Sequence, residues 1–131
     1  MTTLDHVGIA VRDLDAAVKL FTEIIGLKLE GCETVKEQGV KIAFLSAKNI
    51  EVELITPLSD ESSLAKFLEK RGEGLHHIAF RVKGLSDALR RLKSEGLKLI
   101  DEEPRKGAKG RNIAFIHPKS THGVLLELCE E

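Results

Sequence analysis

The feature that most restricts the fold of this chain is an internal repeat with an offset of about 71 residues. Thr3–Val11, TLDHVGIAV, and Gly74–Val82, GLHHIAFRV, share the pattern Leu-x-His followed by apolar residues. Three further matches follow in the same order: GLKL at 26–29 and 96–99, then 42–45 with 113–116, then 52–54 with 126–128. Ordered blocks at a nearly constant offset indicate a tandem duplication. The last offset is 74, so we expect a longer final hairpin in the second copy.

Each copy has the pattern of a β-α-β-β-β module. In the first copy, residues 4–12 alternate as a half-buried strand, and strands are predicted near 27–35, 40–47 and 50–57. A helix capped by Asp13 or Asp15 should lie before Gly26. Its apolar stripe comprises Ala17, Leu20, Phe21, Ile24 and Ile25. The second copy predicts a strand at 75–83, a helix at 85–95, and strands near 97–103, 111–117 and 123–129.

The predicted fold class is therefore α+β, with tandem βαβββ modules that form a curved eight-stranded sheet around a cavity. We expect a single domain, 1–131, with module one at about 1–58 and module two at about 74–131. The segment at about 59–73 should form a capped linker helix.

Composition excludes several classes of partner. The net charge is −1, from 20 basic and 21 acidic residues, which gives no reason to expect nucleic acid or an anionic membrane surface. No apolar run approaches the roughly 18 residues of a membrane span. Cys32 and Cys129 have no CxxC spacing, so neither a disulfide scaffold nor a zinc knuckle is expected. A cytoplasmic location fits these features.

Strand alternation selects two histidines as candidate ligands. His6 shares a strand face with Gly8 and Ala10, and His77 shares its face with Ala79 and Arg81. The opposite faces are apolar and should pack on helices. Each first strand therefore presents a histidine beside small side chains, which leave room for a ligand.

The last strand of each copy contributes a carboxylate in the same way. Glu53 and Glu127 lie within apolar strands, where a carboxylate is costly to bury unless it is paired or binds a metal. Two histidines and two glutamates suit a divalent ion such as Zn, Co, Mn, Ni or Fe(II). On an octahedral ion, two positions would stay open for a chelating substrate. Glu51 has the same parity as Glu53, and either of them is the ligand while the other is solvated.

A single histidine on a strand is more often structural than a ligand. His76 should face the helix side, and His117 lies in a turn with Pro118. His122 is a loop residue with no assigned partner. The recurrence of His6/His77 and of Glu53/Glu127 at matched repeat positions favours the metal site over a structural role for these four residues.

Three stretches resemble the methylmalonyl-CoA epimerases of the vicinal oxygen chelate superfamily. They are LDHVGIAV, VELITPLSDESSLAKFLEKRGEGLHHIAFRV and EEPRKGAKGRNIAFIHPKSTHGVLLEL, and the resemblance runs along nearly the whole chain. It implies that His6, Glu53, His77 and Glu127 bind the metal, with Co²⁺ first and Mn²⁺, Zn²⁺ or Ni²⁺ as alternatives. It also implies methylmalonyl-CoA as substrate, a homodimer and a role in propionate metabolism.

The activity implied by the resemblance is interconversion of (R)- and (S)-methylmalonyl-CoA by 1,1-proton transfer through a metal-stabilised enolate. Glu127 would be both ligand and catalytic group. Several epimerases carry a second glutamate where this chain has Ile42, so the second base is unassigned. No organic cofactor is implied, and Lys106, Lys109, Arg111 and Lys119 are candidates to contact the coenzyme A phosphates.

Two other classes of function are compatible with the same pattern. One is another metalloenzyme of the superfamily, either glyoxalase I (lactoylglutathione lyase) or an extradiol dioxygenase. The other is a metal-free binding protein that sequesters small molecules. The second class requires loss of the His and Glu positions, which are present here.

Overall fold

The computed structural model describes residues 2–131 and forms two compact units. The first unit is His6–His76, and the second unit is His77–Glu131 together with residues 2–5. The strands are β1 (Thr3–Ala10), β2 (Lys28–Val35), β3 (Val40–Ser46), β4 (Glu51–Pro57), β5 (Gly74–Val82), β6 (Arg105–Lys106), β7 (Asn112–Ile116) and β8 (Leu126–Glu130). The α-helices are α1 (Leu14–Lys19), α2 (Ser63–Arg71) and α3 (Leu85–Ser94).

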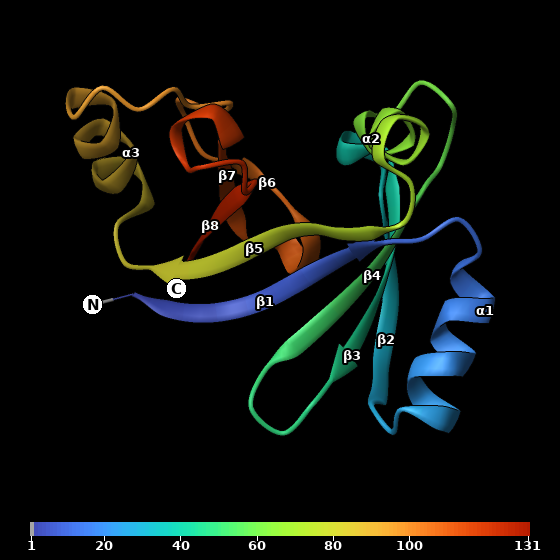
Figure 1. Cartoon of the computed structure of the whole chain (residues 1–131). Coiled ribbons are helices and arrows are strands. Elements are labelled where there is room, and N and C mark those ends of the chain that lie inside the picture. The colour runs from blue at the N-terminus through green and yellow to red at the C-terminus, as the bar shows by residue number, and fades with distance from the viewer. Residues whose placement is uncertain (1) are drawn as a thin grey trace. The chain divides into compact units, whose positions relative to one another are not determined.

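The strands of the first unit lie in the order β2-β3-β4-β1 (Figure 1). Pairing is antiparallel from β2 to β4 and parallel between β4 and β1. One face of this sheet packs against α1, which Asp13 caps by accepting a hydrogen bond from the Ala16 amide. The core cluster on that face comprises Val11, Leu14, Ala43, Leu45 and Leu54. The other face carries His6 and Glu53.

The second unit repeats this arrangement with the strand order β5-β8-β7-β6. Pairing is parallel between β5 and β8 and antiparallel from β8 to β6. The core cluster beside α3 comprises Leu85, Leu89, Ala114, Ile116 and Leu128. Gly84 occupies the N-cap position of α3 and has no side chain that could cap the helix. The Glu130 carboxylate of β8 accepts a hydrogen bond from the Leu85 amide at 2.9 Å instead.

Helix α2 lies in the segment where the sequence predicts a linker helix. Ser62 caps it by accepting a hydrogen bond from the Ala65 amide. Arg12, just after β1, connects that strand to the α2 segment. The Arg12 guanidinium donates to the Leu68 carbonyl, and the Arg12 amide donates to the Glu73 carboxylate. The expected α+β class, with βαβββ order in each copy and eight strands in all, is confirmed.

The strand predicted near 97–103 does not form as a regular strand. Leu99 makes one isolated bridge with Ile116, and β6 begins only at Arg105. Two features interrupt the strand pairing with β7 in this segment. Pro104 has no amide hydrogen to donate, and the Asp101 carboxylate accepts the Phe115 amide hydrogen at 2.9 Å.

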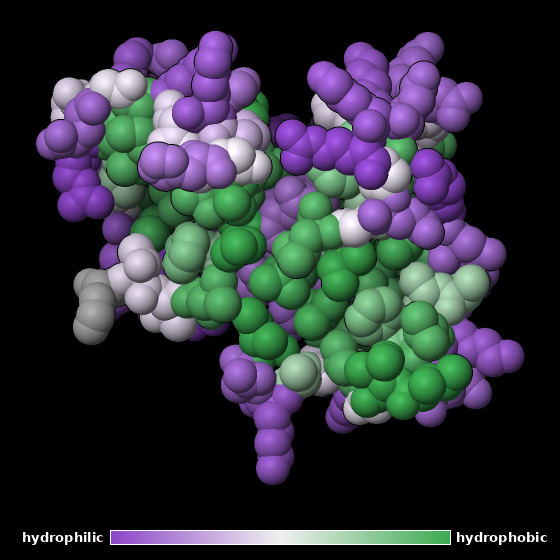
Figure 2. All heavy atoms as spheres, viewed as in Figure 1, coloured by the Kyte–Doolittle hydropathy of each residue, from purple (hydrophilic) through white to green (hydrophobic). Residues whose placement is uncertain are grey.

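The predicted apolar stripe of the first helix is only half buried. Ala17 and Phe21 pack against the core, but Leu20, Ile24 and Ile25 are exposed by 45%, 75% and 59%. The reason is a π-helical turn at Leu20–Ile24, in which the Ile25 amide bonds to the Leu20 carbonyl five residues earlier. This wider turn rotates Ile24 and Ile25, but not Leu20 at its start, away from the α-helical stripe. Figure 2 shows the resulting hydrophobic area at the lower right, where α1 lies in Figure 1.

Candidate metal and proton-transfer site

The first unit contains a buried pair formed by His6 and Glu53. His6 Nε2 lies 3.3 Å from Glu53 Oε2, and the two residues are exposed by 3% and 6%. Strand pairing positions them: β1 and β4 run parallel, and Gly8 lies beside Glu53 in their register. Because alternate residues of a strand share a face, His6, Gly8 and Glu53 lie on the face opposite the α1 core.

The second unit contains the equivalent pair. His77 Nε2 lies 3.5 Å from Glu127 Oε1, with the two residues 4% and 6% exposed. Here β5 and β8 run parallel and Ala79 lies beside Glu127. The His77 ring also meets the edge of Phe115 at a centroid distance of 6.0 Å. The repeat found in the sequence therefore corresponds to a repeated three-dimensional pair.

The separations within the two pairs, 3.3 and 3.5 Å, are those of close contacts between an imidazole nitrogen and a carboxylate oxygen. Imidazole nitrogen and carboxylate oxygen are also an ordinary donor set for a divalent transition metal.

Glu51 is the other carboxylate with the parity of Glu53. It lies opposite His6 in the register of β1 and β4 and is half-buried. The carboxylate that approaches His6 Nε2 within 3.3 Å belongs to Glu53. This geometry favours Glu53 as the ligand.

The three remaining histidines lie outside the two His–Glu pairs. His76 packs edge-on against Phe67 of α2 at 4.8 Å, and burial lowers the pKa of His76 to about 4. His117 Nδ1 accepts a hydrogen bond from the Lys119 amide and so caps the turn Pro118–Ser120. His122 is exposed, in a left-handed conformation with φ of 59°.

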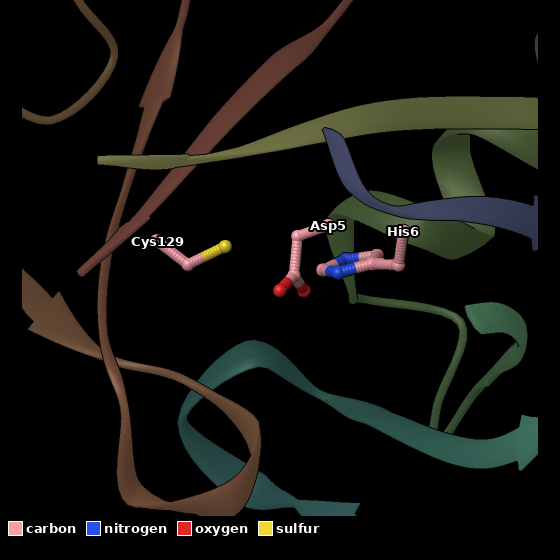
Figure 3. Close-up of side chains that lie close together, drawn as sticks. All are labelled: Asp5, His6 and Cys129. Carbon is pink, nitrogen blue, oxygen red and sulfur yellow. The ribbon is translucent and has the colours of Figure 1, made fainter. Parts of the chain in front are cut away.

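A polar cluster in the second unit was not singled out by the sequence patterns. The Asp5 carboxylate, 7% exposed, accepts from Arg81 Nη2 at 2.9 Å and from Arg111 Nη1 at 3.0 Å. Burial, followed by the charge of Asp5, raises the pKa of the neighbouring Cys129 thiol to about 12. Figure 3 shows Cys129 Sγ directed toward the Asp5 side chain, with His6 following Asp5 along β1. One feature of the sequence could have indicated this cluster: Arg81 is a charged residue within an apolar strand, on the same strand face as His77.

Arg105 is a second cation near His77. Its guanidinium lies over the Phe115 ring at 5.4 Å from the centroid, and its Nε is 3.2 Å from Asp101 Oδ1. Phe115 in turn contacts His77.

Two of the four cations proposed to contact coenzyme A already have partners within the chain. Arg111 donates to the Asp5 carboxylate, and Lys106 donates to the Gly110 carbonyl.

Across residues 2–131, none of the helices is both long enough and apolar enough to cross a membrane. Both cysteines are free thiols, with Cys32 exposed and Cys129 buried.

Comparison with known proteins gives consistent matches along the chain. The profile of the Glyoxalase/Bleomycin resistance protein/Dioxygenase superfamily matches residues 5–115. The chain is 48% identical over 130 residues to the uncharacterized protein YqjC of Bacillus subtilis, covering 99% of this chain and 93% of that protein. It is 38% identical to the ethylmalonyl-CoA/methylmalonyl-CoA epimerase of Cereibacter sphaeroides, covering 95% of each. The crystal structure of methylmalonyl-CoA epimerase from Mycobacterium tuberculosis superposes with a TM-score of 0.92 at 43% identity, covering 97% of this chain and 86% of that one.

Proposed function

The chain belongs to the Glyoxalase/Bleomycin resistance protein/Dioxygenase superfamily, and we propose that it is a metal-dependent isomerase that interconverts (R)- and (S)-methylmalonyl-CoA. The resemblance of its sequence to methylmalonyl-CoA epimerases is confirmed by relatives and solved structures of that name. The reaction is a 1,1-proton transfer at the carbon between the carboxylate and the thioester.

The observation that carries the proposal is the repeated His–Glu pair, at 3.3 Å in the first unit and 3.5 Å in the second. We propose that His6, Glu53, His77 and Glu127 together hold one divalent ion. When bound, such an ion supplies a Lewis acid for the negative charge that develops on the thioester oxygen. Mixed nitrogen and oxygen ligands suit a divalent transition metal. The resemblance implies Co²⁺ first, with Mn²⁺, Zn²⁺ and Ni²⁺ as alternatives.

Glu127 is the proposed proton-transfer group of the second unit. A carboxylate can accept a proton from the α-carbon and return it, which a histidine held as a neutral ligand cannot do at the same atom. The Phe115 ring and the buried Cys129 lie on the same face of this unit and limit access of water to Glu127. Limited access of water also strengthens the electrostatic effect of nearby charges.

The coenzyme A moiety requires cations for its phosphates. Arg111 is already bound to the Asp5 carboxylate, so its charge is partly neutralised. Lys106, Lys109 and Lys119 are exposed on the second unit and are better candidates than Arg111. We expect these contacts to contribute affinity rather than chemistry.

Hydrogen exchange into the substrate tests the proposed reaction directly. The protein is incubated with methylmalonyl-CoA in D₂O, with and without a chelator, and deuterium at the α-carbon is measured together with the ratio of epimers. We expect exchange and epimerisation that stop with the chelator and return when metal is restored. Turnover of a glutathione hemithioacetal, or oxygen consumption with a catechol, would instead assign the chain to the glyoxalase I or dioxygenase branch.

We further propose that the enzyme works in the cytoplasm as a homodimer. Free thiols, one of them exposed, fit a reducing compartment. Leu20, Ile24 and Ile25 form an exposed apolar surface on the first unit, and such surfaces usually mark contacts. Sedimentation should give twice the chain mass, and Ile24→Glu should shift it toward the monomer. A monomeric, fully active wild type would contradict the dimer.

A further inference from the structure

We propose that Arg105 recognises the free carboxylate of the substrate, so that the enzyme selects thioesters of 2-carboxyacyl groups over simple acyl thioesters of coenzyme A. The inference rests on the proposed epimerase function and deepens it, because it names the residue that determines the substrate class. Every residue that positions Arg105 belongs to the second unit, which also contains His77 and Glu127.

Strand register places Arg105 on the face of the second unit that carries Glu127. Strand β6 pairs antiparallel with β7, and Arg105 lies opposite Ile113. Directly paired residues project from the same face of a sheet, and so do Ile113 and Phe115, which are two residues apart on β7. Phe115 is itself paired with Glu127 of β8. Arg105 therefore shares its face with the proposed ligand and proton-transfer group.

The guanidinium of Arg105 lies over the Phe115 ring. Its Cζ atom is 5.4 Å from the ring centroid, and the same ring meets His77 edge-on at a centroid distance of 6.0 Å. One aromatic ring therefore separates the cation from the imidazole of a proposed metal ligand. Phe115 is buried, whereas the Arg105 side chain is 40% exposed. The cation thus lies at the accessible rim of a buried cluster, where a ligand can reach it.

Asp101 holds the cation and the ring together. Asp101 Oδ1 lies 3.2 Å from Arg105 Nε, and Asp101 Oδ2 accepts a hydrogen bond from the Phe115 amide at 2.9 Å. The carboxylate thus uses a different oxygen for each partner. A guanidinium that is already held in position loses less side-chain entropy when a ligand binds than a mobile one would.

The outer nitrogens of Arg105 are available to a ligand. The contact with Asp101 engages Nε, and within residues 2–131 the structure shows no hydrogen-bond partner for Nη1 or Nη2. Their N–H groups lie in one plane and match the two oxygens of a carboxylate. A bidentate, charge-assisted contact of this kind distinguishes an acyl group that carries a carboxylate from one that does not.

The acyl carboxylate fits this position better than the coenzyme A phosphates do. In methylmalonyl-CoA the carboxylate is bonded to the α-carbon, whereas the phosphates lie at the far end of the pantetheine arm. Glu127, the proposed group that exchanges the α-proton, is the strand partner of Phe115. A cation over Phe115 is therefore close to the acyl end of the substrate.

Two other arginines of the second unit have a different environment. Arg81 and Arg111 both donate to the buried Asp5 carboxylate. All three arginines thus have a carboxylate partner, and position rather than a missing partner distinguishes them. Among the described residues, Arg105 is the one whose guanidinium lies over the ring that contacts His77.

The internal repeat shows that the sheet itself does not require this cation. Phe44 matches Phe115 in the repeat, and each of them pairs with a buried glutamate of the following strand. In the first unit, however, Glu33 occupies the register position that Arg105 has in the second. The duplicated scaffold therefore forms with either charge at this position. A role in recognition explains the cation in the second copy.

Binding of two thioesters that differ only in the carboxylate tests the inference. Isothermal titration calorimetry gives dissociation constants for methylmalonyl-CoA and propionyl-CoA, with the full chain and added metal. In Arg105→Gln we expect the preference for methylmalonyl-CoA to fall by about 10–100-fold, with little change for propionyl-CoA. Arg105→Lys keeps the charge and should recover part of the preference. Arg91→Gln is the matched control, since Arg91 is exposed on α3.

The outcomes separate recognition from the alternatives. Equal weakening of both thioesters would overturn the inference, since it would mean that Arg105 binds a phosphate or only supports the fold. The methylmalonyl thioester of N-acetylcysteamine, which has no phosphate, should still bind more weakly to Arg105→Gln than to the wild type. An unchanged preference in Arg105→Gln would also overturn the role of Arg105, while epimerisation by the wild type would leave the proposed function intact. A wild type that does not epimerise methylmalonyl-CoA would contradict the proposed function itself.

Discussion

Gly8 lies directly beside Glu53 in the parallel pairing of β1 with β4. The second unit repeats this relationship with Ala79 beside Glu127. Each buried carboxylate is therefore next to a residue with no side chain or a single methyl group. A bulkier neighbour would fill the space over the carboxylate oxygens. Both copies thus combine a buried His–Glu pair with a small residue beside the carboxylate on the neighbouring strand.

Removal of either proposed histidine ligand should remove the metal. Three remaining protein ligands bind a divalent ion more weakly than four, and in His6→Ala or His77→Ala one of the matched pairs is broken. Elemental analysis after dialysis should show most of the metal lost from both variants, with circular dichroism unchanged. His122→Ala is the control, since His122 is exposed on a loop. Full metal retention in His6→Ala and His77→Ala would exclude the four-ligand site.

The two glutamates should differ in function although their surroundings match. Gln supplies a lone pair to a metal but cannot accept the substrate proton. Glu53→Gln should therefore keep metal and much of the epimerisation rate. Glu127→Gln should lose about 10²–10⁴-fold. The two rates are compared at equal metal occupancy, and equal losses would show that Glu127 has no separate proton-transfer role.

The positions of the candidate ligands were predictable because they depend on strand alternation and on the repeat. His6 and Glu53 lie 3.3 Å apart because β1 and β4 pair in parallel, and the sequence patterns did not predict which strand pairs with β1. Local departures from regular helix geometry could not be predicted from the sequence. The π turn that exposes Ile24 depends on backbone bonds that a periodicity of 3.6 does not reveal.

The sequence patterns also did not predict the polar contacts between residues far apart in the chain. Asp5 precedes a predicted ligand and resembles a solvated strand end in the sequence. Its role follows from Arg81 and Arg111, which lie 76 and 106 positions away in the chain.

The largely buried His76 should make stability depend on pH. Its pKa falls from 6.5 to about 4 on folding, because burial disfavours the charged imidazolium. Between these values the unfolded chain binds more protons than the folded chain, so the free energy of unfolding decreases as the pH falls from about 6.5 to 4. The contribution is at most about 3 kcal/mol.

His76→Phe should flatten this dependence, since Phe keeps an aromatic contact with Phe67 and does not titrate. Urea unfolding at pH 7 and pH 4.5 measures the change, and the wild type should lose about 2–3 kcal/mol more than the variant. His122→Gln is the control and should follow the wild type. An identical loss in wild type and His76→Phe would show that His76 does not cause the acid sensitivity.

The two thiols should react at very different rates with an alkylating reagent. Cys32 is exposed on β2, whereas Cys129 is 1% exposed on β8 and its Sγ lies 3.5 Å from the Phe80 carbonyl oxygen. Burial raises the pKa of Cys129 to about 12, so at pH 8 only about one thiol in 10⁴ is the reactive thiolate. Iodoacetamide at pH 8 should therefore add one group per chain, at Cys32, as peptide mass spectrometry can show. Cys32→Ser should remain unlabelled until urea unfolds it, after which Cys129 is modified. Rapid labelling of folded Cys32→Ser would mean that Cys129 is accessible and ionised, contrary to its position between Phe80 and Asp5.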